Sequence, residues 1–185
     1  MKRMLAVVLL LLTLCGCSGT GSEMDKAMEL RDQLLGSGCT FNVTISADYT
    51  QKVYTFGMKC DVDSSGTVDF QVTEPETISG ITGNISDQGG KLTFDNQALL
   101  FETIADGQIT PVSAPWLLMR TLRSGYIKAC GKYDNGIYIQ IDDSYEKDAL
   151  HLDIWTDENH LPVKAEVQWQ GRRILSMTVE NFTIL

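Results

Sequence analysis

The residues best suited to chemistry in this sequence are its five cysteines and two histidines. Cys39, Cys60 and Cys130 belong to no CxxC motif and have no pair of histidines nearby, and Cys15 and Cys17 stand close to the N-terminus. A zinc site needs three or four such ligands at short spacings. The sequence therefore predicts no metal site.

The two histidines lack the neighbours that a catalytic site requires. His160 falls in a predicted hairpin loop, and His151 alternates onto the face away from Leu150 and Leu152, so both are expected to face solvent. A hydrolase or transferase needs a nucleophile beside a base, or paired carboxylates in a cleft. We predict that the chain is not an enzyme and that it uses no cofactor.

Residues 1–16 are predicted to be a signal peptide. Lys2 and Arg3 precede an apolar block from Leu5 to Leu12, which is too short to span a bilayer, because a spanning helix takes about 20 residues. Removal of this leader deletes two basic residues and no acidic ones, so the formal net charge moves from −9 to −11. Nucleic acid is excluded as a partner, since binding to phosphates needs a basic surface.

The leader ends in Leu14-Cys15-Gly16-Cys17, which resembles the lipobox of bacterial lipoproteins. The resemblance implies cleavage before Cys17 and acylation of that cysteine, palmitate being the typical chain. Residues 17–22 would then be the lipidated cysteine and a flexible linker of small polar residues. The chain would be extracytoplasmic, anchored to the outer face of the cytoplasmic membrane, or to the outer membrane if the cell has one. A plain secretory signal is the alternative.

Residues 23–185 are predicted to form a single domain. Alternating apolar residues between turn residues indicate about eleven strands, nearly all of them antiparallel neighbours. At about 4.8 Å per strand, such a sheet is roughly 50 Å wide and must curl. The predicted fold class is α+β, a curved antiparallel sheet that forms a half-open barrel, with two or three helices as a lid.

The stretch from Cys39 to Cys60 is predicted to be a hairpin with its turn at residues 49–50. This register places Cys39 opposite Cys60 and Phe41 opposite Met58. Cysteines that face each other across two strands are within disulfide distance, and an exported protein meets an oxidising compartment. The sequence predicts a Cys39–Cys60 disulfide, and two buried free thiols are the alternative.

Further hairpins follow from the same alternation of apolar and polar residues. The strongest turn signal is Asn135-Gly136, which favours a type I′ turn that joins Tyr133 to Tyr138. The other predicted opposite pairs are Cys60 with Phe70, Ile85 with Leu92, Leu92 with Phe101, Ile154 with Val163, and Val167 with Leu175. Near the C-terminus the apolar positions change parity to Phe182 and Ile184, which indicates a bulge.

Two amphipathic segments, Ser22 to Leu35 and Pro115 to Ser124, are the predicted helices. Each helix is only about 10 to 12 Å across, so the two together would cover less than half of the uncurled sheet. We therefore predict an apolar cavity, with an ordinary filled core as the alternative. The predicted lining is Phe41, Val43, Phe56, Met58, Phe70, Leu92, Trp116, Leu118, Met119 and Leu122, with Trp116 in contact with the ligand.

The mature chain resembles the lipoprotein-localisation (LolA/LolB-like) superfamily. The most specific match is the final unit, in which Ile154-Trp155-Thr156-Asp157 leads to Leu161-Pro162-Val163-Lys164, then to Gly171 and Asn181-Phe182. The stretch from Pro75 to Leu99 is similar as well. The resemblance implies a half-open barrel that holds acyl chains or another apolar ligand. Lipid-anchored members include acceptors of lipoproteins, glycolipid carriers and a GerS-like germination lipoprotein that acts through a protein partner.

Together these features predict a membrane-anchored extracytoplasmic lipoprotein that binds a lipid, an acyl chain or a lipoprotein. The alternative function is that of an envelope scaffold, which binds and regulates a protein partner such as a cell-wall or spore-germination enzyme.

Overall fold

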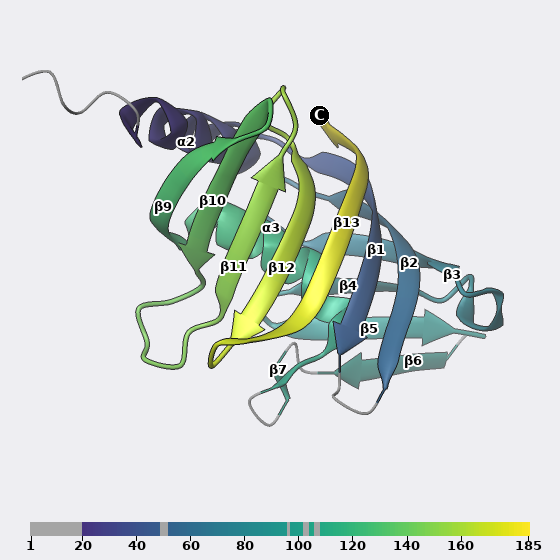
Figure 1. Cartoon of the computed structure of the whole chain (residues 1–185). Helices are drawn as coiled ribbons and strands as arrows, with labels where there is room; N and C mark the ends of the chain where they lie inside the picture. The colour runs from purple at the N-terminus through teal and green to yellow at the C-terminus, as the bar shows by residue number, and fades with distance from the viewer. Residues whose placement is uncertain (1–19, 49–51, 96, 102–103, 106–107) are drawn as a thin grey trace, which may run out of the picture.

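A computed structural model describes residues 20–48, 52–95, 97–101, 104–105 and 108–185. Eleven strands form one antiparallel sheet in the order β6-β5-β4-β3-β2-β1-β13-β12-β11-β10-β9 (Figure 1). The strands of this sheet are β1 (Cys39–Asp48), β2 (Val53–Val62), β3 (Val68–Glu74), β4 (Thr82–Ser86), β5 (Gly89–Phe94), β6 (Gln97–Phe101), β9 (Tyr126–Tyr133), β10 (Gly136–Asp142), β11 (His151–Thr156), β12 (Pro162–Trp169) and β13 (Arg172–Ile184). A separate short hairpin joins β7 (Ile104–Ala105) to β8 (Gln108–Ile109).

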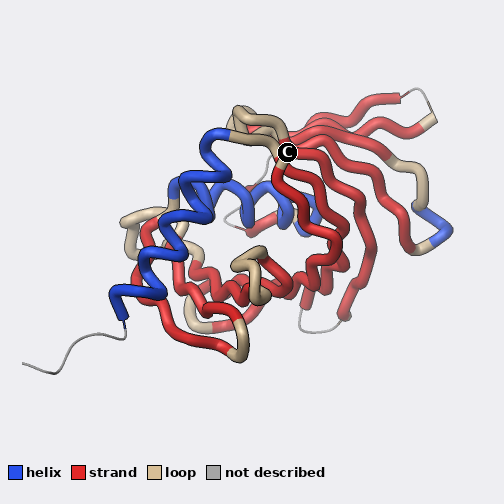
Figure 2. The backbone as a smooth tube through the Cα atoms, turned by 90° about the horizontal axis from the view of Figure 1, so that it is seen from above, coloured by secondary structure: helices blue, strands red, loops and turns tan. Residues whose placement is uncertain are grey.

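The sheet is open and curls around helix α3 (Ala114–Ser124), as the view along the barrel shows (Figure 2). Helix α2 (Thr20–Gly36) contacts β9, β10 and α3. Two short 3₁₀ helices, η1 (Glu76–Ile78) and η2 (Pro111–Ser113), complete the described elements. The predicted half-open antiparallel barrel with two helices is confirmed. No helix within the described ranges is both long and apolar enough to cross a membrane.

Helix α3 is buried because its sequence is apolar around most of its circumference. Eight of its eleven residues are buried, among them Trp116, Leu117 and Leu118. Pro115 lies in the first turn, where a missing N–H leaves no hydrogen bond unmade. A helix that is apolar on nearly all sides belongs inside a core. The helix therefore fills the curve of the sheet and does not merely cover it.

The predicted register of β1 with β2 was wrong by two residues. Cys39 lies opposite Val62, and Cys60 lies opposite Phe41. The two thiols are diagonal neighbours on one face, and both are free in the structure, so the predicted disulfide is not formed there. The physical reason is that a slip of two residues keeps every side chain on its own face, so the apolar pattern fits both registers equally well.

The other hairpins divide between confirmed and shifted registers. Cys60 lies opposite Phe70 and Val167 lies opposite Leu175, as predicted. The shifted pairs, each displaced by two residues from its prediction, are Ile85 with Gly90, Leu92 with Leu99, Tyr133 with Gly136, and Ile154 with Ala165. The predicted irregularity in β13 is confirmed, since its register with β1 shifts between Thr40 and Asn42.

Arg31 joins the two helices. Its Nε donates to the carbonyl oxygen of Leu122 at 2.8 Å, and its Nη2 donates to that of Gly125 at 2.7 Å. These carbonyl groups belong to the C-terminal end of α3, where no further helical N–H is available to them. The half-buried guanidinium of α2 therefore caps α3.

Substitution of Arg31 by alanine is expected to lower the free energy of unfolding by about 2 kcal/mol, because two charge-assisted hydrogen bonds are lost and two carbonyl groups are left without their donor. Urea unfolding followed by circular dichroism would measure the change. Arg173→Ala is the matched control, since Arg173 is exposed and, among the described residues, its side chain bonds only to that of Glu166. It should change stability by less than about 0.5 kcal/mol. Equal effects of the two substitutions would contradict the capping role.

Candidate ligand-binding site

The concave face of the sheet is apolar from β1 to β6, but the helices do not cover all of it. The strand registers place Phe41, Cys60, Phe70, Gly83, Leu92 and Leu99 in one continuous row across six strands. Phe41 is 2% exposed and Phe70 is 4% exposed, whereas Leu92 is half-buried and Leu99 is 63% exposed. Burial is therefore lost steadily toward the β6 edge.

The neighbouring row of side chains shows the same loss of burial toward the edge of the sheet. Val43, Met58 and Val72 lie opposite one another and are all at least 96% buried. The row continues past Ile81, which is half-buried, to Phe94 at the end of β5, which is 52% exposed. The concave apolar side chains at this edge that are not fully buried will be called the β4–β6 shelf. They are Ile81, which directly precedes β4, and Leu92, Phe94, Leu99 and Phe101 of β5 and β6.

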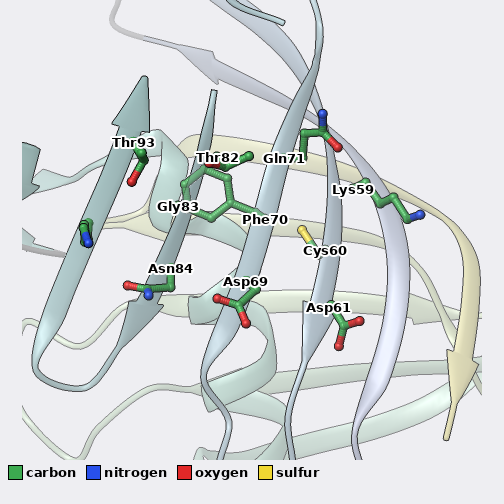
Figure 3. A pocket seen from close by; sticks show the side chains of 11 residues that line it. Lys59, Cys60, Asp61, Asp69, Phe70, Gln71, Thr82, Gly83, Asn84 and Thr93 are labelled. Atoms are coloured by element: carbon green, nitrogen blue, oxygen red, sulfur yellow. The ribbon is translucent and has the colours of Figure 1, made fainter. Parts of the chain in front are cut away.

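Two glycines shape the sheet beside the shelf. A β-carbon at Gly90 would lie 2.2 Å from the ring of Phe101, and one at Gly83 would lie 2.6 Å from the ring of Phe70. Each ring therefore lies over a glycine on the neighbouring strand, as Figure 3 shows for Phe70 and Gly83. The missing side chains let the aromatic rings lie close to the sheet and keep the shelf shallow.

The structure separates the ten predicted lining residues into two groups. Phe56 and Leu92 are half-buried and pack at the margin of the core. The other eight are fully buried members of the core, and they are Phe41, Val43, Met58, Phe70, Trp116, Leu118, Met119 and Leu122. The predicted lining did not include Phe94 and Leu99, although both follow the same alternation as Leu92. The feature that could have indicated them is their position on the last two strands of the sheet, far from either predicted helix.

A hollow on the other side of β2 to β5 is lined mainly by polar residues (Figure 3). It has a volume of about 450 Å³, and its rim carries the exposed side chains of Lys59, Asp69, Gln71 and Asn84. These residues alternate with buried ones such as Phe70, so they lie on the convex face of the sheet. This hollow is not the apolar cavity that the sequence predicted.

The two buried thiols are held in an unreactive state. Burial raises the pKa of Cys39 to about 12, and burial together with the nearby Cys39 raises the pKa of Cys60 further. The Cys39 thiol lies 3.9 Å from the sulfur of Met119. Because the thiolate is the reactive form, both side chains act as apolar core residues at neutral pH.

His151 lies on the convex face of β11, as predicted, but between two carboxylates. Its Nδ1 is 2.7 Å from Asp142 and its Nε2 is 3.3 Å from Asp153, whose carboxylate also accepts a hydrogen bond from Tyr138. Burial opposes the ionisation of Asp142, yet hydrogen bonds from His151 and Lys128 outweigh it and lower the pKa of that carboxyl. These bonds run across β9, β10 and β11, so the cluster ties the strands together.

Fold and shelf together define a half-barrel protein whose concave apolar face is covered at one side and open at the other. Similar solved structures include an uncharacterized conserved protein from Thermus thermophilus, with 9% identity over 88% of this chain and 87% of that chain and a TM-score of 0.50. They also include a LolA superfamily protein from Nitrosomonas europaea, with 12% identity over 91% and 94% of the two chains and a TM-score of 0.44. The lipoprotein LppX from Mycobacterium tuberculosis has 11% identity over 87% and 93%, with a TM-score of 0.42.

A LolA superfamily protein is among the similar structures. The likeness at these identities concerns the fold alone, and the GerS-like branch stays a prediction. No protein-family model matches the sequence, and no curated protein matches it significantly. The predicted signal peptide, Cys17, Ser18 and Gly19 lie outside the described residues. The prediction of a flexible linker up to residue 22 was wrong at its end, because residues 20–22 already belong to α2.

Proposed function

We propose that this chain is a lipid-anchored extracytoplasmic binding protein whose β4–β6 shelf receives an acyl chain of a lipid or of a lipoprotein. The loss of burial along the row from Phe41 to Leu99 carries this proposal. Apolar surface that stays in water is unfavourable by about 25 cal/mol per Å². A contiguous patch of such surface, continuous with the core, is the kind of surface that an apolar ligand covers.

The site is proposed to lie at the margin of the core, and not between α3 and the central strands. Leu117 and Leu118 of α3 are completely buried, as is Ile45 of the central strand β1, so an acyl chain there would have to displace α3. The shelf needs no such displacement, because Leu99 and Phe94 are already open to solvent. The proposed lipid on Cys17, which precedes α2, would keep the shelf close to a membrane that supplies acyl chains.

The adjacent residues Leu99 and Leu100 offer a direct test, because they point to opposite faces of β6. Leu99→Glu is expected to weaken the uptake of a fluorescent fatty acid at least tenfold, since a charge would replace a side chain whose burial contributes about 2 kcal/mol. Leu100→Glu, on the convex face, should leave uptake unchanged. Both would be measured by titration of protein that carries Cys17→Ser, so that its own lipid cannot occupy the shelf.

Native mass spectrometry of the same protein should show a co-purified lipid that is lost in Leu99→Glu. Equal uptake by the two glutamate variants would exclude the shelf as the binding site. A bare protein mass without any fatty-acid uptake would contradict acyl-chain binding altogether.

A second candidate function is binding of a protein partner, and the edge strand β6 favours it. β6 ends the sheet, and its outward Leu100 is 78% exposed. An open strand edge with an apolar side chain is suited to the addition of an extended peptide strand. Affinity purification from envelope extracts distinguishes the two functions, since Leu100→Glu should remove a protein partner and spare fatty-acid uptake, while Leu99→Glu should abolish the uptake.

A further inference from the structure

A second pocket lies alongside α3, between this helix and two hairpin turns. It has a volume of about 520 Å³ and is lined by Trp116, Arg120 and Arg123 of α3, by residues 65–67 of the β2–β3 turn, and by residues 86–88 of the β4–β5 turn. Two guanidinium groups therefore share one concave site, in a chain whose formal net charge is −9.

Arg123 is held in place by the backbone of the β2–β3 turn. Its Nη1 donates to the carbonyl oxygen of Asp63 at 3.2 Å, and its Nη2 donates to that of Ser64. Gly66 has a φ of +92°, and a β-carbon there would lie 3.5 Å from the Arg123 guanidinium. The turn therefore fixes the position of this cation, and the distance from Gly66 is an ordinary van der Waals contact.

Arg120 is positioned differently, and its guanidinium donates no hydrogen bond to a described residue. Its guanidinium lies over the ring of Trp116, with 5.1 Å between Cζ and the ring centroid. Within the described residues, its only charged partner is Asp87, whose carboxylate is 3.8 Å from Nε and whose side chain is 83% exposed. Such an exposed pair contributes at most about 1 kcal/mol. Stacking on the indole orients the edge of the guanidinium, where five N–H groups can bind an oxyanion.

The two arginines are three residues apart and thus lie on the same face of α3. Like charges at this spacing destabilise a helix by a few tenths of a kcal/mol. Arg123 is in the last turn, where a cation interacts favourably with the helix dipole. Arg120 precedes that turn, so the helix dipole does not offset the repulsion from Arg123 there. The hydroxyl of Ser86, also in the lining, accepts a hydrogen bond from the Gln88 N–H, so its hydrogen is left to donate.

We propose that this pocket binds a phosphate group, with the Arg120 guanidinium as its principal ligand and Arg123 as a fixed second charge. Planar guanidinium groups bind two oxygens of a phosphate at once, and they do so more strongly where an aromatic ring holds them in place. The group could be carried by a lipid headgroup or be free in solution, since the chemistry of recognition is the same. This site is independent of the acyl-chain site, which lies on the shelf.

The test is isothermal titration of the full chain with inorganic phosphate, at an ionic strength held constant with sodium chloride. A flotation assay with vesicles of phosphatidylglycerol, and with vesicles of phosphatidylcholine for comparison, runs in parallel. Arg120→Gln is expected to weaken binding at least tenfold. Asp87→Asn should strengthen it about threefold, because it removes the opposing carboxylate. Arg173→Gln on β13 is the matched control and should change nothing.

Arg120-dependent binding of inorganic phosphate supports a site for a free phosphate group, and Arg120-dependent flotation with phosphatidylglycerol alone supports a headgroup site. Absence of both, or equal losses in Arg120→Gln and Arg173→Gln, would overturn the proposal. Because the gain expected for Asp87→Asn needs no loss of folding, it separates a binding effect from unfolding. Leu99→Glu should leave phosphate binding intact even if it abolishes acyl-chain uptake, so failure of one site says nothing of the other.

Discussion

Replacement of Leu118 by alanine is expected to lower the free energy of unfolding by about 3 kcal/mol, within the range of 2 to 5 kcal/mol for a leucine removed from a well-filled core. Leu118 is completely buried at the middle of α3, and the side chains around it belong to one continuous apolar cluster. The substitution would leave a cavity that surrounding strands cannot close without moving. Urea unfolding, with Leu100→Ala as the matched control on the surface, measures the effect.

This prediction separates two views of α3. If the helix fills the half-barrel, removal of Leu118 costs several kcal/mol and the affinity for fatty acid at the shelf stays the same. If the helix were a lid over a hollow, the same substitution would destabilise little and would change ligand uptake. A loss below about 1 kcal/mol would therefore favour the lid, and with it the cavity that the sequence predicted.

The sequence was sufficient to predict the fold. Alternation of apolar and polar residues within Cys39 to Val62 and Leu150 to Leu175 marks half-buried strands, and it gave the correct inward face for most residues that were used in a pairing. Val163 is an exception: it is 37% exposed beside the buried Pro162, where the register of β11 with β12 shifts. The parity change at Phe182 was read correctly as a bulge, and in the structure its ring stacks on Phe41 with centroids 5.3 Å apart. Face and element type depend on local pattern, and local pattern is what a single sequence contains.

Register was harder to predict, because it depends on turns. The pairing of Cys60 with Phe70 was correct, whereas the pairing of Cys39 with Cys60 was displaced by two residues. The apolar pattern does not distinguish registers that differ by two, so a shift in the choice of turn residues moves the whole hairpin. A predicted disulfide depends on register more strictly than a predicted core does, since its two Cα atoms must lie within about 7 Å.

Uncovered apolar sheet surface was predicted correctly, but its place was not, and binding of a ligand there stays a prediction. The excess of apolar sheet over helix was real, yet it is concentrated at the β4–β6 shelf and not spread along the barrel. The reason is the depth of α3, which follows from burial of Trp116 and Leu117 as well as the inward Leu118. Helical periodicity indicates which face is apolar, but only the curvature of the sheet determines how far the helix sinks into it.

Gly136 is the position at which the smallest substitution is expected to have a large effect. The sequence predicted it as a turn residue, but the structure places it at the start of β10, opposite Tyr133. A β-carbon there would lie 2.2 Å from the carbonyl oxygen of Thr156 and 2.4 Å from that of Asp157. The missing side chain thus allows the backbones of β10 and β11 to lie close together. A buried hydrogen bond of 2.9 Å from the Ile137 N–H to the Thr156 hydroxyl also joins them.

Gly136→Ala should therefore lower the free energy of unfolding by about 3 kcal/mol or more, since the new methyl group meets main-chain atoms and not a side chain that could rotate away. Gly131→Ala is the matched control in the same hairpin, because a β-carbon at Gly131 meets no atom within 4 Å. It should be neutral, or stabilising by up to about 1 kcal/mol through the lower entropy of the unfolded chain. Thermal and urea unfolding of the two variants measure the difference. Equal stabilities of the two variants would contradict the prediction, because they would show that β10 and β11 can move apart at Gly136 at little cost.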